Sequence, residues 1–226
     1  MSPRLRLPLL LALLLPVSGP ATPARAAGTA AAIAKPDSVV VLETVEGRIV
    51  IRLASREAPK TVANFRSLVA RGFYDSTYFH RVIPGFMIQG GDPYSRDADP
   101  FNDGQGGPGW TVPAEIGLPH VRGAVAMARM PDAVNPAKDS NGSQFFICLA
   151  DRPDLDRGGY TVFGRVISGM STVDRIAALA NTPGIARTIS GPNPQQLALI
   201  RHARLEPAPK PAARRAAKTV QPATPK

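Results

Sequence analysis

The fold of this chain is constrained most strongly by short apolar segments with strand-like alternation, separated by segments rich in glycine and proline. In "GRIVIRLA" (47–54), Ile49, Ile51 and Leu53 recur at every second position, the period of a strand with one buried face. Comparable segments predict eight strands: two within 39–54 around Glu46-Gly47, two within 78–90 around Pro84-Gly85, and one each in 123–129, 143–150, 161–167 and 196–206.

Two segments have the helical period instead. Residues 58–75 place five apolar residues on one helical face, with Pro59 suited to the first turn and Gly72 to the end: Val62, Phe65, Leu68, Val69 and Phe73. Residues 171–180 form the second candidate helix. Many short strands with only two helices predict a mainly β fold, a closed barrel or a sandwich, rather than an alternating α/β fold.

The two ends of the chain differ from the centre. Residues 1–26 combine a basic start, the apolar run "LPLLLALLLPV" and an Ala-x-Ala ending, which predicts a signal peptide and an exported, periplasmic protein without stable membrane insertion after signal removal. Residues 27–37 read as a linker, and 207–226 as a disordered basic tail rich in alanine and proline. The central domain, 38–206, remains.

The charge is concentrated at those ends. The whole chain has a net charge of +10, but residues 27–200 contain 17 basic and 16 acidic side chains. A nucleic-acid-binding core with a basic face is therefore not expected.

Motifs for metal, cofactor and nucleophilic chemistry are missing. The three histidines are scattered, and Cys148, the single cysteine, lies in the apolar run "QFFICLA" as a small core residue. Ser143 is outside a Gly-x-Ser-x-Gly elbow, and "DADPFND" (97–103) resembles a calcium loop only in composition. We therefore expect no metal and no cofactor.

The segment "FHRVIPGFMIQGGDP" (79–93) places a single cation, Arg81, in an apolar run, with Asp75 the only acid within six residues on either side. Taken alone, such an arginine is most simply a strand residue that faces solvent or a carboxylate. Phe86, Met87 and Phe146, taken alone, are most simply core residues. The combination of these residues with two further motifs favours a functional site.

Those motifs are "NGSQFFI" (141–147) and "YTVFGRV" (160–166). With "FHRVIPGFMIQGGD" (79–92), in this order and spacing, the sequence resembles the cyclophilin family of peptidyl-prolyl cis-trans isomerases over residues 38–206. The resemblance implies an eight-stranded antiparallel closed barrel capped by two α-helices. It also implies an enzyme that accelerates rotation about X–Pro bonds without a cofactor.

The resemblance implies that Arg81 and Gln89 are the catalytic residues, and the amide of Gln89 is suited to hold the guanidinium of Arg81 in place. The substrate-binding residues that it implies are Phe86, Met87, Ala128, Arg129, Gln144, Phe146, Leu155 and Tyr160. Three positions depart from the family pattern: Arg129 stands for an asparagine, Tyr160 for a histidine, and Asp154 for the pocket-edge tryptophan of cyclosporin-sensitive members. The last departure predicts weak cyclosporin binding.

Two functions from different classes fit these residues. One is an isomerase of X–Pro bonds in folding proteins of the cell envelope, acting as a monomer on proline-containing polypeptides. The other is a non-catalytic proline-peptide-binding module or chaperone that uses the same groove, since a fold does not by itself fix a function.

Overall fold

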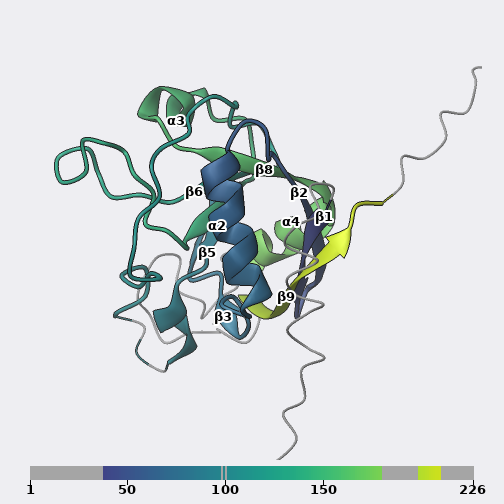
Figure 1. Ribbon diagram of the computed structural model, residues 1–226. Coiled ribbons are helices and arrows are strands. Elements are labelled where there is room, and N and C mark those ends of the chain that lie inside the picture. The colour runs from purple at the N-terminus through teal and green to yellow at the C-terminus, as the bar shows by residue number, and fades with distance from the viewer. Residues whose placement is uncertain (1–37, 98, 100, 180–197, 210–226) are drawn as a thin grey trace, which may run out of the picture.

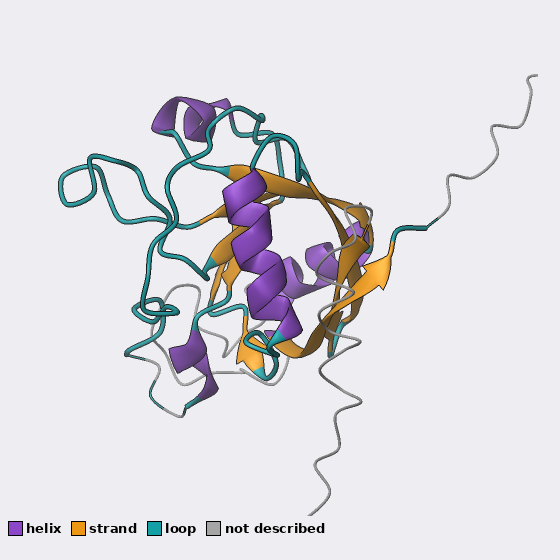
Figure 2. Ribbon diagram, in the orientation of Figure 1, coloured by secondary structure: helices purple, strands orange, loops and turns teal. Residues whose placement is uncertain are grey.

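A computed structural model of the chain describes residues 38–97, 99, 101–179 and 198–209. Its centre is one antiparallel sheet of nine strands, in the order β3-β9-β1-β2-β8-β6-β7-β5-β4 (Figures 1 and 2). The strands are β1 (Ser38–Thr44), β2 (Gly47–Leu53), β3 (Thr77–Tyr78), β4 (Arg81–Ile83), β5 (Met87–Gly90), β6 (Ala124–Met127), β7 (Phe145–Cys148), β8 (Val162–Ser168) and β9 (Leu199–Pro207). The predicted signal peptide, linker and most of the basic tail lie outside the described residues.

The sheet curls because its two edge strands, β3 and β4, follow one another in the chain with only Phe79 and His80 between them. Helix α2 (Pro59–Ala70) lies across the opening of the curled sheet, and α4 (Met170–Leu179) lies behind it (Figure 2). Apolar residues of both helices join the inner residues of the strands in one core. The mainly β, antiparallel, barrel-like fold with capping helices is therefore confirmed.

Two details differ from the expectation. The ninth strand is β3, whose two residues are too few to show any alternation. A third helix, α3 (Pro153–Gly158), and a 3₁₀ helix, η1 (Pro93–Arg96), occupy segments for which the sequence analysis predicted no helix. Helix α3 is too short for an apolar period, but it carries terminal signals: Pro153 at its start, acids in its first turn and Gly159 in the left-handed conformation after its end.

The start of α2 is capped from a distant part of the chain. Its N-cap residue, Ala58, has no side chain that could accept a hydrogen bond. The carboxylate of Glu115 instead accepts the backbone N–H groups of Lys60 at 3.0 Å and Thr61 at 2.8 Å. A negative group at this end of a helix also interacts favourably with the helix dipole. Gly72, with a φ of 69°, follows the last turn as predicted.

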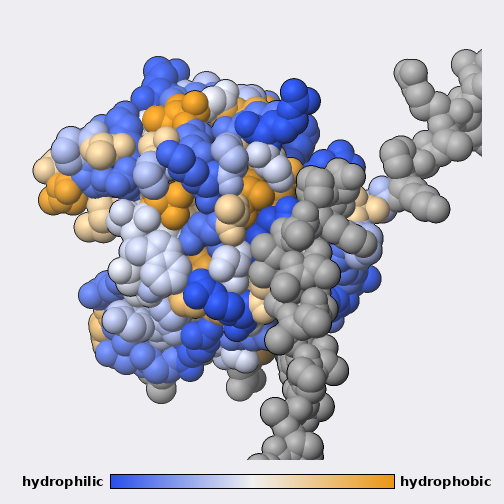
Figure 3. Space-filling model, viewed as in Figure 1, coloured by the Kyte–Doolittle hydropathy of each residue, from blue (hydrophilic) through white to orange (hydrophobic). Residues whose placement is uncertain are grey.

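An aromatic cluster fills the core beneath α2. Phe65 of the helix packs against Tyr74, Phe145 and Phe163, with ring centroids 4.8–5.5 Å apart. The hydroxyl of Tyr74 donates to the carbonyl of Ser143 at 3.1 Å, so its polar end is satisfied inside the core. Burial raises the pKa of Tyr74 well above its usual value. On the face shown in Figure 3, hydrophobic residues form only small, separate patches.

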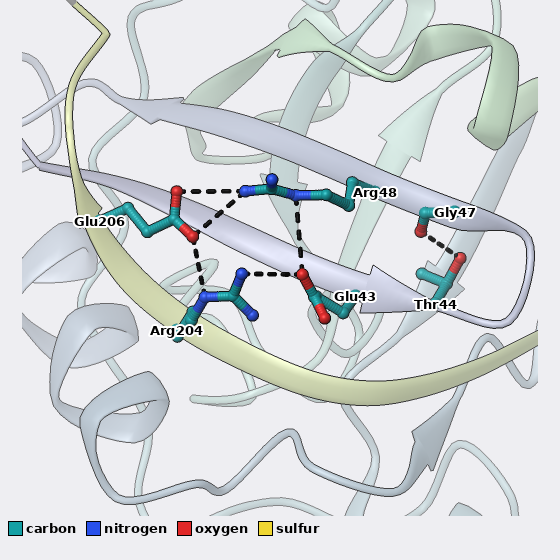
Figure 4. A network of polar contacts seen from close by, with 6 residues as sticks. All are labelled: Glu43, Thr44, Gly47, Arg48, Arg204 and Glu206. Carbon is teal, nitrogen blue, oxygen red and sulfur yellow. Dashed lines mark hydrogen bonds and ion pairs between the residues drawn. The ribbon is translucent and has the colours of Figure 1, made fainter.

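The outer face of β1, β2 and β9 carries a ring of four ion pairs (Figure 4). Arg204 contacts Glu43 and Glu206, each at 2.8 Å, and Arg48 contacts Glu206 at 3.1 Å and Glu43 at 3.6 Å. In the strand register Val41 of β1 lies opposite Arg204 of β9, two residues before Glu43, and it is 0% exposed. The ring therefore links β9, the last strand in the described part of the chain, to β1 and β2.

We predict that Glu206→Gln lowers the free energy of unfolding by about 0.5–1 kcal/mol at low salt, because it removes carboxylate contacts to two arginines at a partly exposed site. In about 1 M NaCl the difference should vanish, since exposed charges are then screened within roughly 3 Å. Urea unfolding at both salt concentrations measures this. Glu57→Gln, at an exposed acid with no ion pair in the described part of the chain, is the control, and a difference that persists in high salt would contradict the interpretation.

Candidate active site

A row of side chains on the outer face of the sheet is set by strand register. In the β4–β5 hairpin Arg81 lies opposite Gln89, and across β5 and β7 Gln89 lies opposite Phe146. Phe146 lies opposite Ala126 on β6. Side chains alternate between the two faces of a strand, so the neighbours Ile88 and Ile147 point into the core instead.

The hairpin turn completes this arrangement. Pro84 and Gly85 form the bend, with Gly85 at a φ of 73°, a conformation that residues with a side chain rarely adopt. The N–H of Phe86 donates to the carbonyl of Ile83 at 3.0 Å. The turn thus places Phe86 and Met87 beside the row that Arg81 begins.

These residues surround a pocket on the outside of the barrel. Its volume is about 150 Å³, well below the roughly 300–1,000 Å³ of sites for drug-sized ligands, so it suits a single amino-acid side chain. It is lined by every predicted site residue except Gln144: Arg81, Phe86, Met87, Gln89, Ala128, Arg129, Phe146, Leu155 and Tyr160.

Gln144 lies behind the pocket in a directed chain of hydrogen bonds, here called the amide chain: Arg81, Gln89, Gln144 and the backbone of the 104–106 loop. Nη1 of Arg81 donates to Oε1 of Gln89 at 3.2 Å, and Nε2 of Gln89 donates to Oε1 of Gln144 at 2.9 Å. Nε2 of Gln144 donates to the carbonyls of Gly104 at 2.9 Å and Gly106 at 2.8 Å.

The direction of the amide chain follows from its last bonds. A carbonyl accepts hydrogen bonds only, so Gln144 must turn its NH₂ group toward the loop and its oxygen toward Gln89. Gln89 must then donate to Gln144 and present its own oxygen to Arg81. Gln144 is only 1% exposed, so water does not offer it an alternative partner. The guanidinium is held by an oriented acceptor without being neutralised.

Two arginines line the pocket, but they are engaged differently. Arg129, with a side chain 5% exposed, pairs with Asp132 at 2.6 Å, donates to the carbonyl of Gly158 and lies 4.6 Å from the ring centre of Tyr160. Arg81 has no ion pair within the described residues. Arg81 is therefore the cation available to a molecule in the pocket, while Arg129 is a structural support of its wall.

The aromatic walls are held from behind by residues that the sequence analysis did not assign. Phe146 stacks on His120 at 6.0 Å between ring centres, and Tyr160 meets Phe146 edge-on at 5.8 Å. Nδ1 of His120 contacts Asp156 of α3 at 2.7 Å. Hydrogen bonds from the side chain and then the backbone of His120 lower the pKa of Asp156.

The other wall, Phe86, is covered by Arg152, whose guanidinium lies 4.1 Å from the ring centre and pairs with Asp154 at 2.7 Å. Asp154 is the position where cyclosporin-sensitive relatives are expected to carry tryptophan. The pocket edge is therefore charged in this chain. No periodicity or motif marks Arg152 or His120, because their partners are distant in sequence or lie within one turn of a short helix.

Trp110 and Cys148 lie outside the pocket. Trp110 donates from Nε1 to Asn64 at 2.9 Å, with Arg71 over its ring, and does not line the pocket. Cys148 is buried on β7, and burial raises the pKa of its thiol to about 12, which confirms a core role. Within the described residues, no group of three or more His, Cys, Asp or Glu side chains could hold a metal ion, and no helix is long and apolar enough to cross a membrane.

Comparison with known proteins agrees with this geometry. The sequence model of the family described as "Cyclophilin type peptidyl-prolyl cis-trans isomerase/CLD" matches residues 39–202. The chain is 42% identical to peptidyl-prolyl cis-trans isomerase-like 1 of Gibberella zeae, over 74% of this chain and 93% of that protein. It is 44% identical to peptidyl-prolyl cis-trans isomerase A of Dickeya dadantii, over 61% and 70% of the respective chains.

Solved structures give the same result. A crystal structure of a cyclophilin-type isomerase from Cryptosporidium parvum superposes with a TM-score of 0.64 at 30% identity, covering 76% of this chain and 99% of that one. A second structure of that protein, in the presence of the dipeptide Ala-Pro, has a TM-score of 0.62. The family match over most of the chain and these relatives show that the protein belongs to the cyclophilin-type peptidyl-prolyl cis-trans isomerases.

Proposed function

We propose that this protein accelerates rotation about X–Pro bonds in polypeptides that fold in the cell envelope, with Arg81 as the catalytic residue. One observation carries the proposal: a guanidinium without an ion pair in the described chain, fixed by Gln89 at 3.2 Å, borders a pocket of about 150 Å³ that Phe86, Met87 and Phe146 also line. The export-like residues 1–26 support the envelope as the site of action.

The reaction breaks no bond between heavy atoms. Amide resonance sets a barrier of roughly 18–20 kcal/mol, and the uncatalysed step at X–Pro takes tens to hundreds of seconds. Rotation removes the conjugation and leaves a lone pair on the proline nitrogen. A fixed donor near that nitrogen bonds more strongly to the twisted amide than to either planar form, and this differential binding lowers the barrier.

Arginine suits this task because it stays charged and carries several N–H donors in a rigid plane. Phe86, Met87 and Phe146 would hold the pyrrolidine ring while the preceding carbonyl turns. Their apolar surfaces would also exclude water, which strengthens the field of the guanidinium. The amide chain keeps Arg81 in place before the substrate arrives, so little reorganisation accompanies the reaction.

We predict that Arg81→Ala lowers kcat/KM by about 10²–10³, the loss typical of removing one donor that stabilises a transition state. Arg81→Lys should recover only part of this, since an ammonium lacks the planar fork. A protease-coupled assay with a proline tetrapeptide measures the rates, and circular dichroism with urea unfolding shows that the fold is retained.

The same assay decides between the isomerase and the non-catalytic proline-peptide binder or chaperone. If the wild-type protein suppresses aggregation of an unfolded client but leaves the tetrapeptide rate unchanged, the binder is correct and the isomerase proposal fails. Equal rates for wild type and Arg81→Ala would also contradict the role of Arg81.

The amide chain makes a separate prediction. Gln89→Leu and Gln144→Leu should each reduce kcat about tenfold with little change in KM, because both release the guanidinium without altering the apolar walls. The double variant should be no slower than Gln89→Leu alone, since the two residues act in series. Additive losses would show that they act independently.

The pH dependence follows from the absence of proton transfer and from His80, next to Arg81. Burial lowers the pKa of His80 to about 4, outweighing the opposite effect of Asp92. The imidazole is thus neutral near pH 7. We expect kcat/KM to be flat from about pH 6 to 8 and to fall toward pH 4, where a charged His80 would repel Arg81.

Stability should change in the same range. The pKa of His80 is lower in the folded protein than in the unfolded chain. Its contribution to the free energy of unfolding, about 3 kcal/mol, is therefore fully present above about pH 6.5 and is lost as the pH falls toward 4. Asp103 opposes it, because burial and then Asp92 raise its pKa to about 6. Urea unfolding of His80→Gln tests the contribution of the histidine. On acidification the free energy of unfolding of this variant should fall less than that of the wild type.

For the activity, a bell-shaped profile of kcat/KM centred near pH 7 would contradict the expected pH dependence.

A further inference from the structure

A second concave surface lies on the outer face of β2, β6 and β8, which neighbour one another in the sheet (Figure 1). This client groove has a volume of about 350 Å³. Its apolar lining comes from the sheet and from the segment before β6: Leu53, Ala54, Leu118, Pro119, Val121, Ala124, Val162 and Ile167, with Gly164 between them. Its charged lining consists of Arg52, Arg165 and Glu57.

The two arginines are direct cross-strand neighbours. The register between β2 and β8 pairs Arg52 with Arg165, and both are exposed. Like charges in this position destabilise a sheet. In the described part of the chain neither arginine has a carboxylate within salt-bridge distance, whereas Arg48, at the start of β2, contacts Glu43 and Glu206. The pair is therefore a positive site whose counter-charge is absent from the described residues.

The client groove and the pocket beside Arg81, here called the proline pocket, share one apolar layer on the outside of the barrel. Val162 and Ala124 of the groove belong to the same packed cluster as Met87 and Phe146 of the pocket. Leu118 and Val121 pack against this cluster from the groove side, and Phe86, Leu155 and Tyr160 pack against it from the pocket side. The groove is thus continuous with the surface that receives a proline residue.

We propose that the client groove binds a second segment of the same polypeptide client, an extended stretch in which an apolar side chain is flanked by acidic residues. The apolar side chain would lie on Val121, Ala124 and Val162, and a carboxylate would lie between Arg52 and Arg165, relieving their repulsion. Glu57, on the same rim, would interact with an N–H or a basic residue of that segment. The inference rests on the proposed function only for the identity of the partner.

Such a second contact makes entry of the proline into the pocket an intramolecular event. The local concentration of the proline would rise, while the chemistry at Arg81 would be unchanged. The groove should therefore act on KM and leave kcat as it is.

Direct binding tests the groove independently of isomerase activity. The probe is a fluorescein-labelled peptide of alternating Leu and Glu without proline. A matched peptide of alternating Leu and Gln is the control. Fluorescence anisotropy measures the binding of each peptide to the purified full chain. We expect the acidic peptide to bind about tenfold more tightly than the Gln peptide. The double variant Arg52→Glu with Arg165→Glu should abolish this preference.

Two further variants separate charge and apolar contributions. Arg201→Glu makes one such charge reversal at an exposed position of β9 outside the groove, so it should bind like the wild type. Ile167→Ser removes an apolar side chain from the groove without touching the shared layer, and it should weaken both peptides. Equal binding of the two peptides, or unchanged binding by the double variant, would overturn the proposal. Binding of phosphatidylglycerol vesicles in place of both peptides would also overturn it.

Kinetics then test the link to the pocket. A proline tetrapeptide joined by a Gly-Ser linker to the Leu-Glu segment should have a KM about tenfold lower than the tetrapeptide alone, with the same kcat. The double arginine variant should lose this advantage but retain the wild-type rate on the tetrapeptide. If the tetrapeptide is not turned over at all, the isomerase proposal fails, and the anisotropy result still decides the groove.

Discussion

The pairing of β4, β5 and β7 is the constraint on which the rest of the structure depends. It places Arg81, Gln89 and Phe146 in one row across three strands, a cation, an amide and an aromatic ring in that order. A shift of β5 by one residue would turn Gln89 into the core and bring Ile88 to the surface. The buried residues between them, Ile88 and Ile147, therefore secure the site as much as the fold.

The two faces of the curled sheet carry different apolar clusters. The inner face holds the aromatic cluster around Phe65, which gives the rigid frame. The outer face carries a smaller apolar layer with Phe146, Met87 and Val162, and this layer is open at two places, the proline pocket and the client groove. A site on the outside of a closed core can be shaped by loops and by α3 while the core packing is left intact.

The sequence was sufficient for the features that depend on local patterns. Alternation in 47–54 predicted which residues of β2 are buried, and Pro59 with Gly72 predicted the limits of α2. The pocket residues were found through the resemblance of three long motifs, and the structure brings them together. The sequence analysis did not predict features that depend on contacts between distant segments. Examples are the stacking of His120 on Phe146, the position of Arg152 over Phe86, and the cap that Glu115 forms at the start of α2. A two-residue strand such as β3 is defined only by its partner, Ile200 and Leu199 of β9, and has no pattern of its own.

The amide chain ends on main-chain carbonyls of Gly104 and Gly106, and this has a mechanical consequence. A Cβ on residue 106 would collide with the carboxylate of Asp92, so the backbone here approaches its neighbours as closely as only glycine allows. The backbone at residues 104–106 is thereby packed closely against Asp92 at the far end of the amide chain. Because two side-chain amides connect this backbone to the guanidinium, a shift of residues 104–106 would also change the orientation of Arg81.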